Sequence, residues 1–251
     1  MNSAYAPDAP CAPWGFWASL AWALLATAAW FATQAGLSAL MLKEFGLDLD
    51  VTREEIDAVM PHGVFISIVA IAAAPVALGV IALAVRRARC RLSDYLALGW
   101  PAPREWLIGI LAILVLLPVA DLVSYLLGYD VTPDFVTDVY SSARDGSAVW
   151  LLVLTVVVAA PVVEEVIFRG FLLPGLAPRT GAAGAIVLTS LGWSAMHMQY
   201  EPYYLLHIFV LGLALGWLRW RSGSTSLVIV LHAMVNVFAL AQAAVIVERI
   251  G

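Results

Sequence analysis

A succession of long, continuously apolar segments is the feature that most constrains this chain. Each is close to or above the ~20 residues that a helix needs to cross a bilayer. Strands of a membrane barrel would alternate apolar and polar residues, and an open sheet cannot satisfy its edges in lipid. We therefore predict an all-α, polytopic transmembrane helix bundle of about seven to eight spans. Seven segments meet the criterion: 14–42, 62–85, 105–127, 149–176, 182–200, 203–220 and 225–247.

The composition excludes an ordinary water-soluble domain. Of the 251 residues, 63% are hydrophobic and 12% are charged, whereas soluble domains are about half apolar and a quarter charged. The surplus of apolar side chains cannot be buried in a core of this size and must face lipid. The net charge is −5 and no basic tract occurs, so the lipid bilayer is an expected partner and nucleic acid is not. Small size and frequent Ala, Leu and Arg are typical of a bacterial inner-membrane protein.

The loops between the predicted spans alternate in charge. Eight Arg residues fall in the loops 86–104, 177–181 and 219–224. The positive-inside rule places these loops in the cytoplasm, with the N-terminus inside and the C-terminus outside for seven spans. An eighth span within 14–61 would move the N-terminus outside. The opposite side holds four Lys or Arg residues: Lys43, Arg53, Arg144 and Arg249.

Two adjacent glutamates and an arginine lie inside the predicted span 149–176. Charged groups in hydrocarbon are costly, so each is a candidate functional residue. Glu165 and Arg169 are four residues apart in the order that favours an ion pair on a helix. Adjacent helical residues point about 100° apart, so Glu164 faces another direction. We interpret the Glu165–Arg169 pair as structural and Glu164 as the functional carboxylate.

Two later spans contribute further polar residues. His197 falls in the span 182–200, and His232 and Asn236 lie four residues apart on one face of the span 225–247. With Glu164, these residues could converge in an intramembrane polar cavity. Such a set can activate a water molecule, either as a general base with polar stabilisers or as the ligands of a divalent metal.

Three motifs now stand in a fixed order: E-E-x-x-x-R at 164–169, W-x-x-x-H at 193–197 and H-x-x-x-N at 232–236. In this order the chain resembles the CAAX-protease/bacteriocin-processing (CPBP, or Abi) family, although that family has Phe where this chain has Trp193. The segment 209–224, with its G-x-x-x-G, also looks like the corresponding part of the family. Residues 1–148 would be N-terminal spans without recognisable motifs. Residues 149–247 would form the catalytic core spans of one integrated membrane domain.

The resemblance implies an intramembrane endopeptidase that hydrolyses a peptide bond of a membrane-associated peptide or protein. It also implies roles for individual residues in this hydrolysis: activation of water by Glu164 and His197, stabilisation of the oxyanion by His232 and Asn236, and support of the site by Glu165 and Arg169.

The metal requirement and the activity each have an alternative. Members of the family are described as metalloproteases, and a metal-independent glutamate mechanism is also argued. The chain has no H-E-x-x-H, and we expect no obligatory metal; in the alternative, zinc would bind Glu164, His197 and His232. The alternative function is a non-proteolytic membrane immunity or scaffold protein with the same fold. A small transporter would show paired halves, and the sequence has no such symmetry.

The position of His232 along its span predicts where the cavity opens. His232 follows Thr225 by seven residues, which is roughly 10 Å of helix. If the span begins at the cytoplasmic face, the cavity takes water and substrate from the cytoplasm. His197 would lie much deeper from the same face, although both histidines should reach one water.

Overall fold

The fold is an all-α bundle, seen in a computed structural model that describes residues 13–250 except 49, 51, 53 and 57–59. Within those residues every regular element is a helix. Six helices there are long and apolar enough to cross a membrane. The prediction of an integral membrane helix bundle is therefore confirmed. Arg53, one of the charges used to predict the orientation, lies outside the described residues.

Five long helices flank a central helical run of 47 residues, Val149–Ala195. The five are α1 (Phe16–Glu44), α3 (His62–Arg87), α5 (Pro103–Leu127), α10 (Pro202–Ser222) and α11 (Thr225–Ile250). The central run alternates α- and π-helical geometry: α7 (Val149–Val153), η1 (Leu154–Ala159), α8 (Ala160–Glu165), η2 (Val166–Leu172) and α9 (Leu173–Ala195). Two short helices complete the described set: α4 (Leu92–Tyr95) and α6 (Asp134–Asp145).

The central run reverses direction inside α9. A straight helix of 47 residues would be about 70 Å long, more than twice the ~30 Å of a bilayer core. Gly181 interrupts it with φ 71° and ψ 170°, a backbone conformation that residues with a Cβ rarely adopt. The run therefore makes two passes in opposite directions, and the described residues hold six candidate spans when the run is counted once, close to the seven to eight predicted. The second pass ends at Ala195 and not near residue 200, so His197 lies in a turn and not, as predicted, in a helix.

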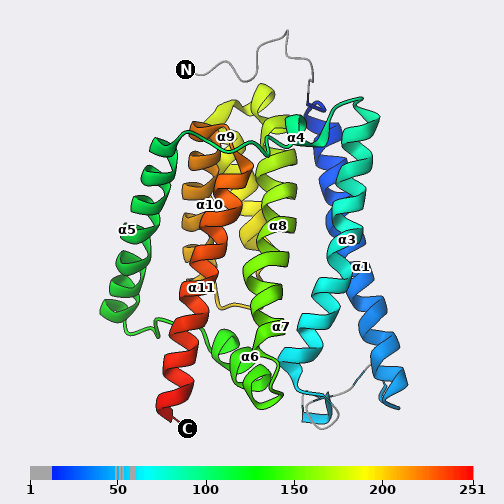
Figure 1. Cartoon of the computed structure of the whole chain (residues 1–251), viewed down its shortest axis with the longest axis vertical. Helices are drawn as coiled ribbons and strands as arrows, with labels where there is room; N and C mark the ends of the chain where they lie inside the picture. The colour runs from blue at the N-terminus through cyan, green and yellow to red at the C-terminus, as the bar shows by residue number, and fades with distance from the viewer. Residues whose placement is uncertain (1–12, 49, 51, 53, 57–59, 251) are drawn as a thin grey trace.

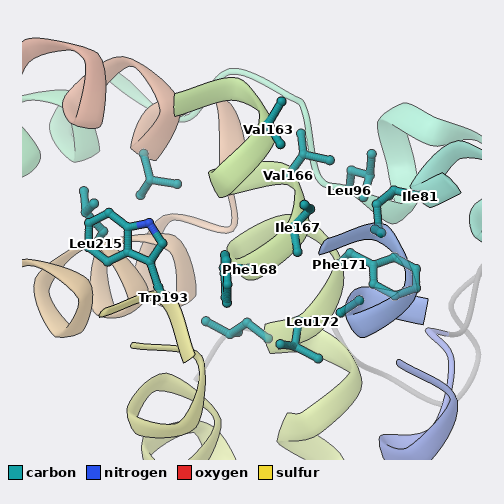
Figure 2. Packing of buried hydrophobic residues seen from close by; sticks show 14 of the residues in the cluster. Ile81, Leu96, Val163, Val166, Ile167, Phe168, Phe171, Leu172, Trp193 and Leu215 are labelled. Carbon is teal, nitrogen blue, oxygen red and sulfur yellow. The ribbon is translucent and has the colours of Figure 1, made fainter. Parts of the chain in front are cut away.

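The central run lies between two flanks of the bundle (Figure 1). The α1–α3 pair forms one flank and α5 the other, with α10 and α11 beside the central run. Helix α1 packs on α3, α9 and η2, and Figure 2 shows Phe171 of η2 beside Ile81 of α3, with Ile167 in the same cluster of buried residues. These three side chains are fully buried. The N-terminal spans thus support the central run within one bundle.

The basic and acidic loops gather at opposite ends of the bundle. At the basic end, the Thr225 hydroxyl donates to the Leu96 carbonyl at 2.5 Å, and Arg221 pairs with Glu105 at 2.9 Å. Helix α6 packs on α3 and α11 at the other end (Figure 1). Helix α6 falls between two predicted spans, where no helix was expected, although its buried Val139 and Ala143 lie four residues apart on one face.

The separation of charge generates a prediction of orientation. Single cysteines at Ser141 and at Ser222, in a background whose native cysteines are serine, should report the two ends. An impermeant thiol reagent should label position 141 on intact cells and position 222 only after permeabilisation, because basic loops stay in the cytoplasm. Labelling of 222 but not 141 on intact cells would reverse the orientation.

Candidate active site

A fully buried carboxylate lies at the centre of the candidate site. Arg169 donates from Nη1 to Glu165 Oε1 at 3.0 Å, and both side chains are 0% exposed. His232 donates from Nδ1 to the same oxygen, also at 3.0 Å. Arg169 further donates from Nη2 to the Gly212 carbonyl at 3.3 Å, and its guanidinium lies 4.4 Å from the centre of the Trp193 ring. The predicted Glu165–Arg169 contact is present. Further contacts join this pair to His232 on α11, Gly212 on α10 and Trp193 on α9.

Glu164 points to a different partner. Its side chain is 7% exposed, and Oε2 accepts a hydrogen bond of 2.6 Å from Trp193 Nε1. Oε1 makes no hydrogen bond to the described residues. The hydrogen bond from the buried indole fixes the orientation of the Glu164 carboxylate. Its second oxygen can still accept a hydrogen bond from water.

His197 is fixed by the turn after α9. Its Nδ1 lies 2.9 Å from the Trp193 carbonyl oxygen, and the ring is half-buried. Because a carbonyl can only accept, Nδ1 carries the proton, and Nε2 of the neutral ring has the lone pair. The Trp193 ring lies 5.2 Å, centre to centre, from both His197 and His232. Trp193 thus lies between two histidines that the sequence placed at different depths.

Asn236 is tied to the π-helical part of the central run. Its Nδ2 donates to the Val156 carbonyl in η1 at 2.7 Å. A π-helical turn leaves carbonyls without their usual i+4 donor, and Asn236 satisfies one of them. The amide keeps a second hydrogen and its oxygen for another partner.

Trp193, His197, His232 and Asn236 line one cavity of about 210 Å³. The cavity extends along α11 as far as Gln242, roughly 25 Å from the start of that helix. At the basic end, Leu227, Val228 and Leu231 of α11 are fully buried. The cavity therefore leads towards the α6 end, and the prediction that it opens at the basic end is wrong. The prediction used only the depth of His232 along α11, and this depth does not show that tight packing closes the cavity at the basic end.

Two buried polar atoms in the site have no protein partner among the described residues: Glu165 Oε2 and Arg169 Nε. Such atoms are usually satisfied by ordered water. Glu164 and Glu165 are two carboxylates beside the single guanidinium of Arg169, so the formal charge of these three residues is minus one.

The described side chains do not form a ready metal site. No group of three His, Cys, Asp or Glu residues among them is placed to hold an ion. In the proposed zinc set of Glu164, His197 and His232, one Glu164 oxygen is already engaged by Trp193. No step below passes through a metal, and the absence of an obligatory metal stays a prediction.

The sequence patterns assigned no role to two residues of the site. Trp193 was noted only as the aromatic residue of the W-x-x-x-H motif, and its indole N–H holds Glu164. Tyr200 stacks on His197 at 6.1 Å, lines the cavity, and lies within the electrostatic reach of Glu164. The signal for Tyr200 was its position three residues after His197, which in a turn brings the two rings together.

Comparison with known proteins finds a family that the motif-bearing segment resembles. Residues 146–238 match the family described as Rce1-like, type II CAAX prenyl endopeptidase Rce1-like. The resemblance to the CAAX-protease family is thus confirmed for the segment that contains the three motifs. An uncharacterized 24.3 kDa protein of Escherichia coli is 38% identical over 86 residues, or 33% of this chain and 39% of that protein. The chain spans about two fifths of the length of this relative. No solved structure matches.

The Glu165–Arg169 pair yields a prediction of stability. Glu165→Ala and Arg169→Ala should each lower the amount of folded protein in the membrane, because breaking a buried pair costs on the order of 3–5 kcal/mol. Quantitative blotting and thermal unfolding in detergent measure the effect. The double mutant should recover part of the loss, and only part, because His232 also loses its partner. The exposed Arg179→Ala is the matched control. Single mutants as abundant and heat-resistant as the parent would show that the pair is not structural.

Proposed function

We propose that this protein is a CAAX-type intramembrane endopeptidase that hydrolyses a peptide bond of a membrane-associated peptide or protein. One observation supports the proposal most: Glu164 is buried and held by Trp193, whose ring also contacts His197 and His232 beside a shared cavity. The match of residues 146–238 to a family of CAAX prenyl endopeptidases points to the same chemistry.

In the first step, Glu164 and His197 activate the attacking water. The unengaged oxygen of Glu164 accepts one hydrogen of the water, and His197 Nε2 accepts or orients the other. As the water oxygen bonds to the carbonyl carbon, Glu164 takes the proton that the water releases. The product of this step is a tetrahedral intermediate with a negatively charged oxygen.

In the second step, His232 and Asn236 stabilise that oxyanion and the peptide bond breaks. Protonated His232 donates from Nε2, since Nδ1 is engaged by Glu165, and Asn236 donates its second amide hydrogen. The proton held by Glu164 passes to the leaving nitrogen. The C–N bond then breaks, giving a carboxylic acid and an amine.

Glu165 and Arg169 support this chemistry without touching the substrate. A carboxylate that accepts from one ring nitrogen of a histidine fixes the orientation and the tautomer of that ring. Glu165 does so for His232, and Arg169 holds Glu165 from the other side. We further propose that this site acts without an obligatory metal and that the protein lies in the bacterial inner membrane.

Removal of either water-activating residue should abolish proteolysis while the protein still accumulates. Loss of a general base commonly costs 10²–10⁴-fold in rate, and Glu164→Ala also removes the contact that orients the water. The measurement is a comparison of protein termini in membranes from cells that express the parent, Glu164→Ala or His197→Ala. Glu248→Ala, an exposed carboxylate on α11, is the control and should retain the parental termini.

The same comparison separates the two functions considered for this fold. Termini that are present with the parent and Glu248→Ala but absent with Glu164→Ala identify the substrate of an endopeptidase. Identical termini in all four strains would contradict the proposal and favour a scaffold or immunity role.

A further inference from the structure

A second hollow lies at the α6 end of the bundle, outside the proposed catalytic cavity. Its volume is about 420 Å³, twice that of the catalytic cavity. Its walls come from the α5–α6 connection, from α6 and from the end of α11. The lining residues are Asp130, Val131, Thr132, Asp134, Thr137, Asp138, Ser141, Arg144, Ile246 and Val247.

The cleft carries an excess of negative charge. Asp130, Asp134 and Asp138 are exposed carboxylates. Arg144 is the one basic residue in the lining, and it pairs with Asp145 at 3.3 Å. The carboxylates of Asp130 and Asp134 make no hydrogen bond or ion pair with the described residues. Two of the three charges are therefore available to a ligand.

A buried hydroxyl in the same cleft points independently to a ligand. Thr132 is 3% exposed, and its Oγ1 has no hydrogen-bond partner among the described residues. A buried polar group without a partner is destabilising, and native proteins seldom retain one without a reason. A hydroxyl beside carboxylates suits a ligand with N–H donors.

The cleft adjoins the catalytic cavity. Val131 lines both hollows. Tyr204 lines the catalytic cavity and also a smaller hollow bounded by Asp134 and Glu201. The charges of Asp130, Asp134 and Glu201 all act on the Tyr204 hydroxyl. A peptide that extends from the catalytic cavity towards the α6 end would therefore meet this acidic surface within a few residues.

We infer that the acidic cleft binds Lys or Arg side chains of the substrate, a few residues from the bond that is hydrolysed. The inference rests on the proposed function and adds a class of substrate, a peptide with a cationic segment. The cleft is not arranged as a chelating site, because no three acidic residues in the described chain are grouped to hold a metal ion. Separated carboxylates and a hydroxyl match the spread N–H donors of a guanidinium or several ammonium groups.

Binding can be tested without turnover. The full chain carrying Glu164→Ala is purified in a non-ionic detergent, and binding of two fluorescein-labelled peptides is followed by anisotropy. One peptide alternates Leu with Lys, and the other alternates Leu with Glu. The Lys peptide should bind, and binding should weaken with added salt, because exposed charges are screened.

Variants then locate the binding. D130N/D134N/D138N should weaken the Lys peptide about tenfold, since each exposed ion pair contributes modestly. E44Q/D48N/D50N removes the same charge at the same end of the bundle, away from the cleft, and should change little. Thr132→Val keeps the shape, removes the unpartnered hydroxyl, and should weaken binding about threefold. If the triple variant is poorly folded, Asp134→Asn alone replaces it in the test, and this single variant should weaken binding of the Lys peptide by a smaller factor.

Equal weakening by the two triple variants, or equal binding of the Glu peptide, would overturn the inference. Because every variant is inactive by design, that result leaves hydrolysis untouched. Conversely, if the parent shows no proteolysis while cleft variants still lose the Lys peptide, the proposed function fails and the binding site stands.

Discussion

The rest of the site depends on the buried carboxylate of Glu165. One oxygen of this group accepts from both Arg169 and His232, so it joins the central run to α11. Arg169 continues the network to the Gly212 carbonyl on α10 and to the face of Trp193 on α9. A Cβ at Gly212 would lie 3.0 Å from Ser190 Cβ and 3.1 Å from the Trp193 ring, so the glycine allows α10 to approach α9 closely there. Loss of the carboxylate would leave Arg169 unpaired in a medium of low dielectric constant.

Two adjacent carboxylates with different proposed tasks lie where the central run changes from α- to π-helical geometry. Glu164 and Glu165 are the last residues of α8, immediately before η2. Glu165 turns towards Arg169 and His232, whereas Glu164 turns towards Trp193. π-helical segments are rare and are frequent at functional sites, where they change the direction of side chains.

Local patterns predicted much of this structure, and long-range packing determined what they missed. Apolar runs located the spans, and the four-residue spacing of Glu165 and Arg169 predicted their contact, because both depend only on neighbouring sequence. At the early end of α9, the Ser194 hydroxyl donates to the Leu205 carbonyl of α10 at 2.7 Å, a contact that the local sequence does not predict. The direction of the cavity depends on which end of α11 is packed, and no local pattern contains that information.

Helical backbone geometry limits the conformation in which a substrate can be cleaved. A peptide bond inside an α-helix has its carbonyl and N–H engaged in the helix and is surrounded by the side chains of adjacent turns. The bond to be hydrolysed must therefore be presented by an extended or unwound segment. Unwinding in lipid exposes backbone N–H and C=O groups that need partners. Polar groups of His197, Tyr200, His232 and Asn236 along the wall can provide such partners, and an acidic cleft at the exit would hold a cationic segment outside the hydrocarbon, where the chain is already unwound.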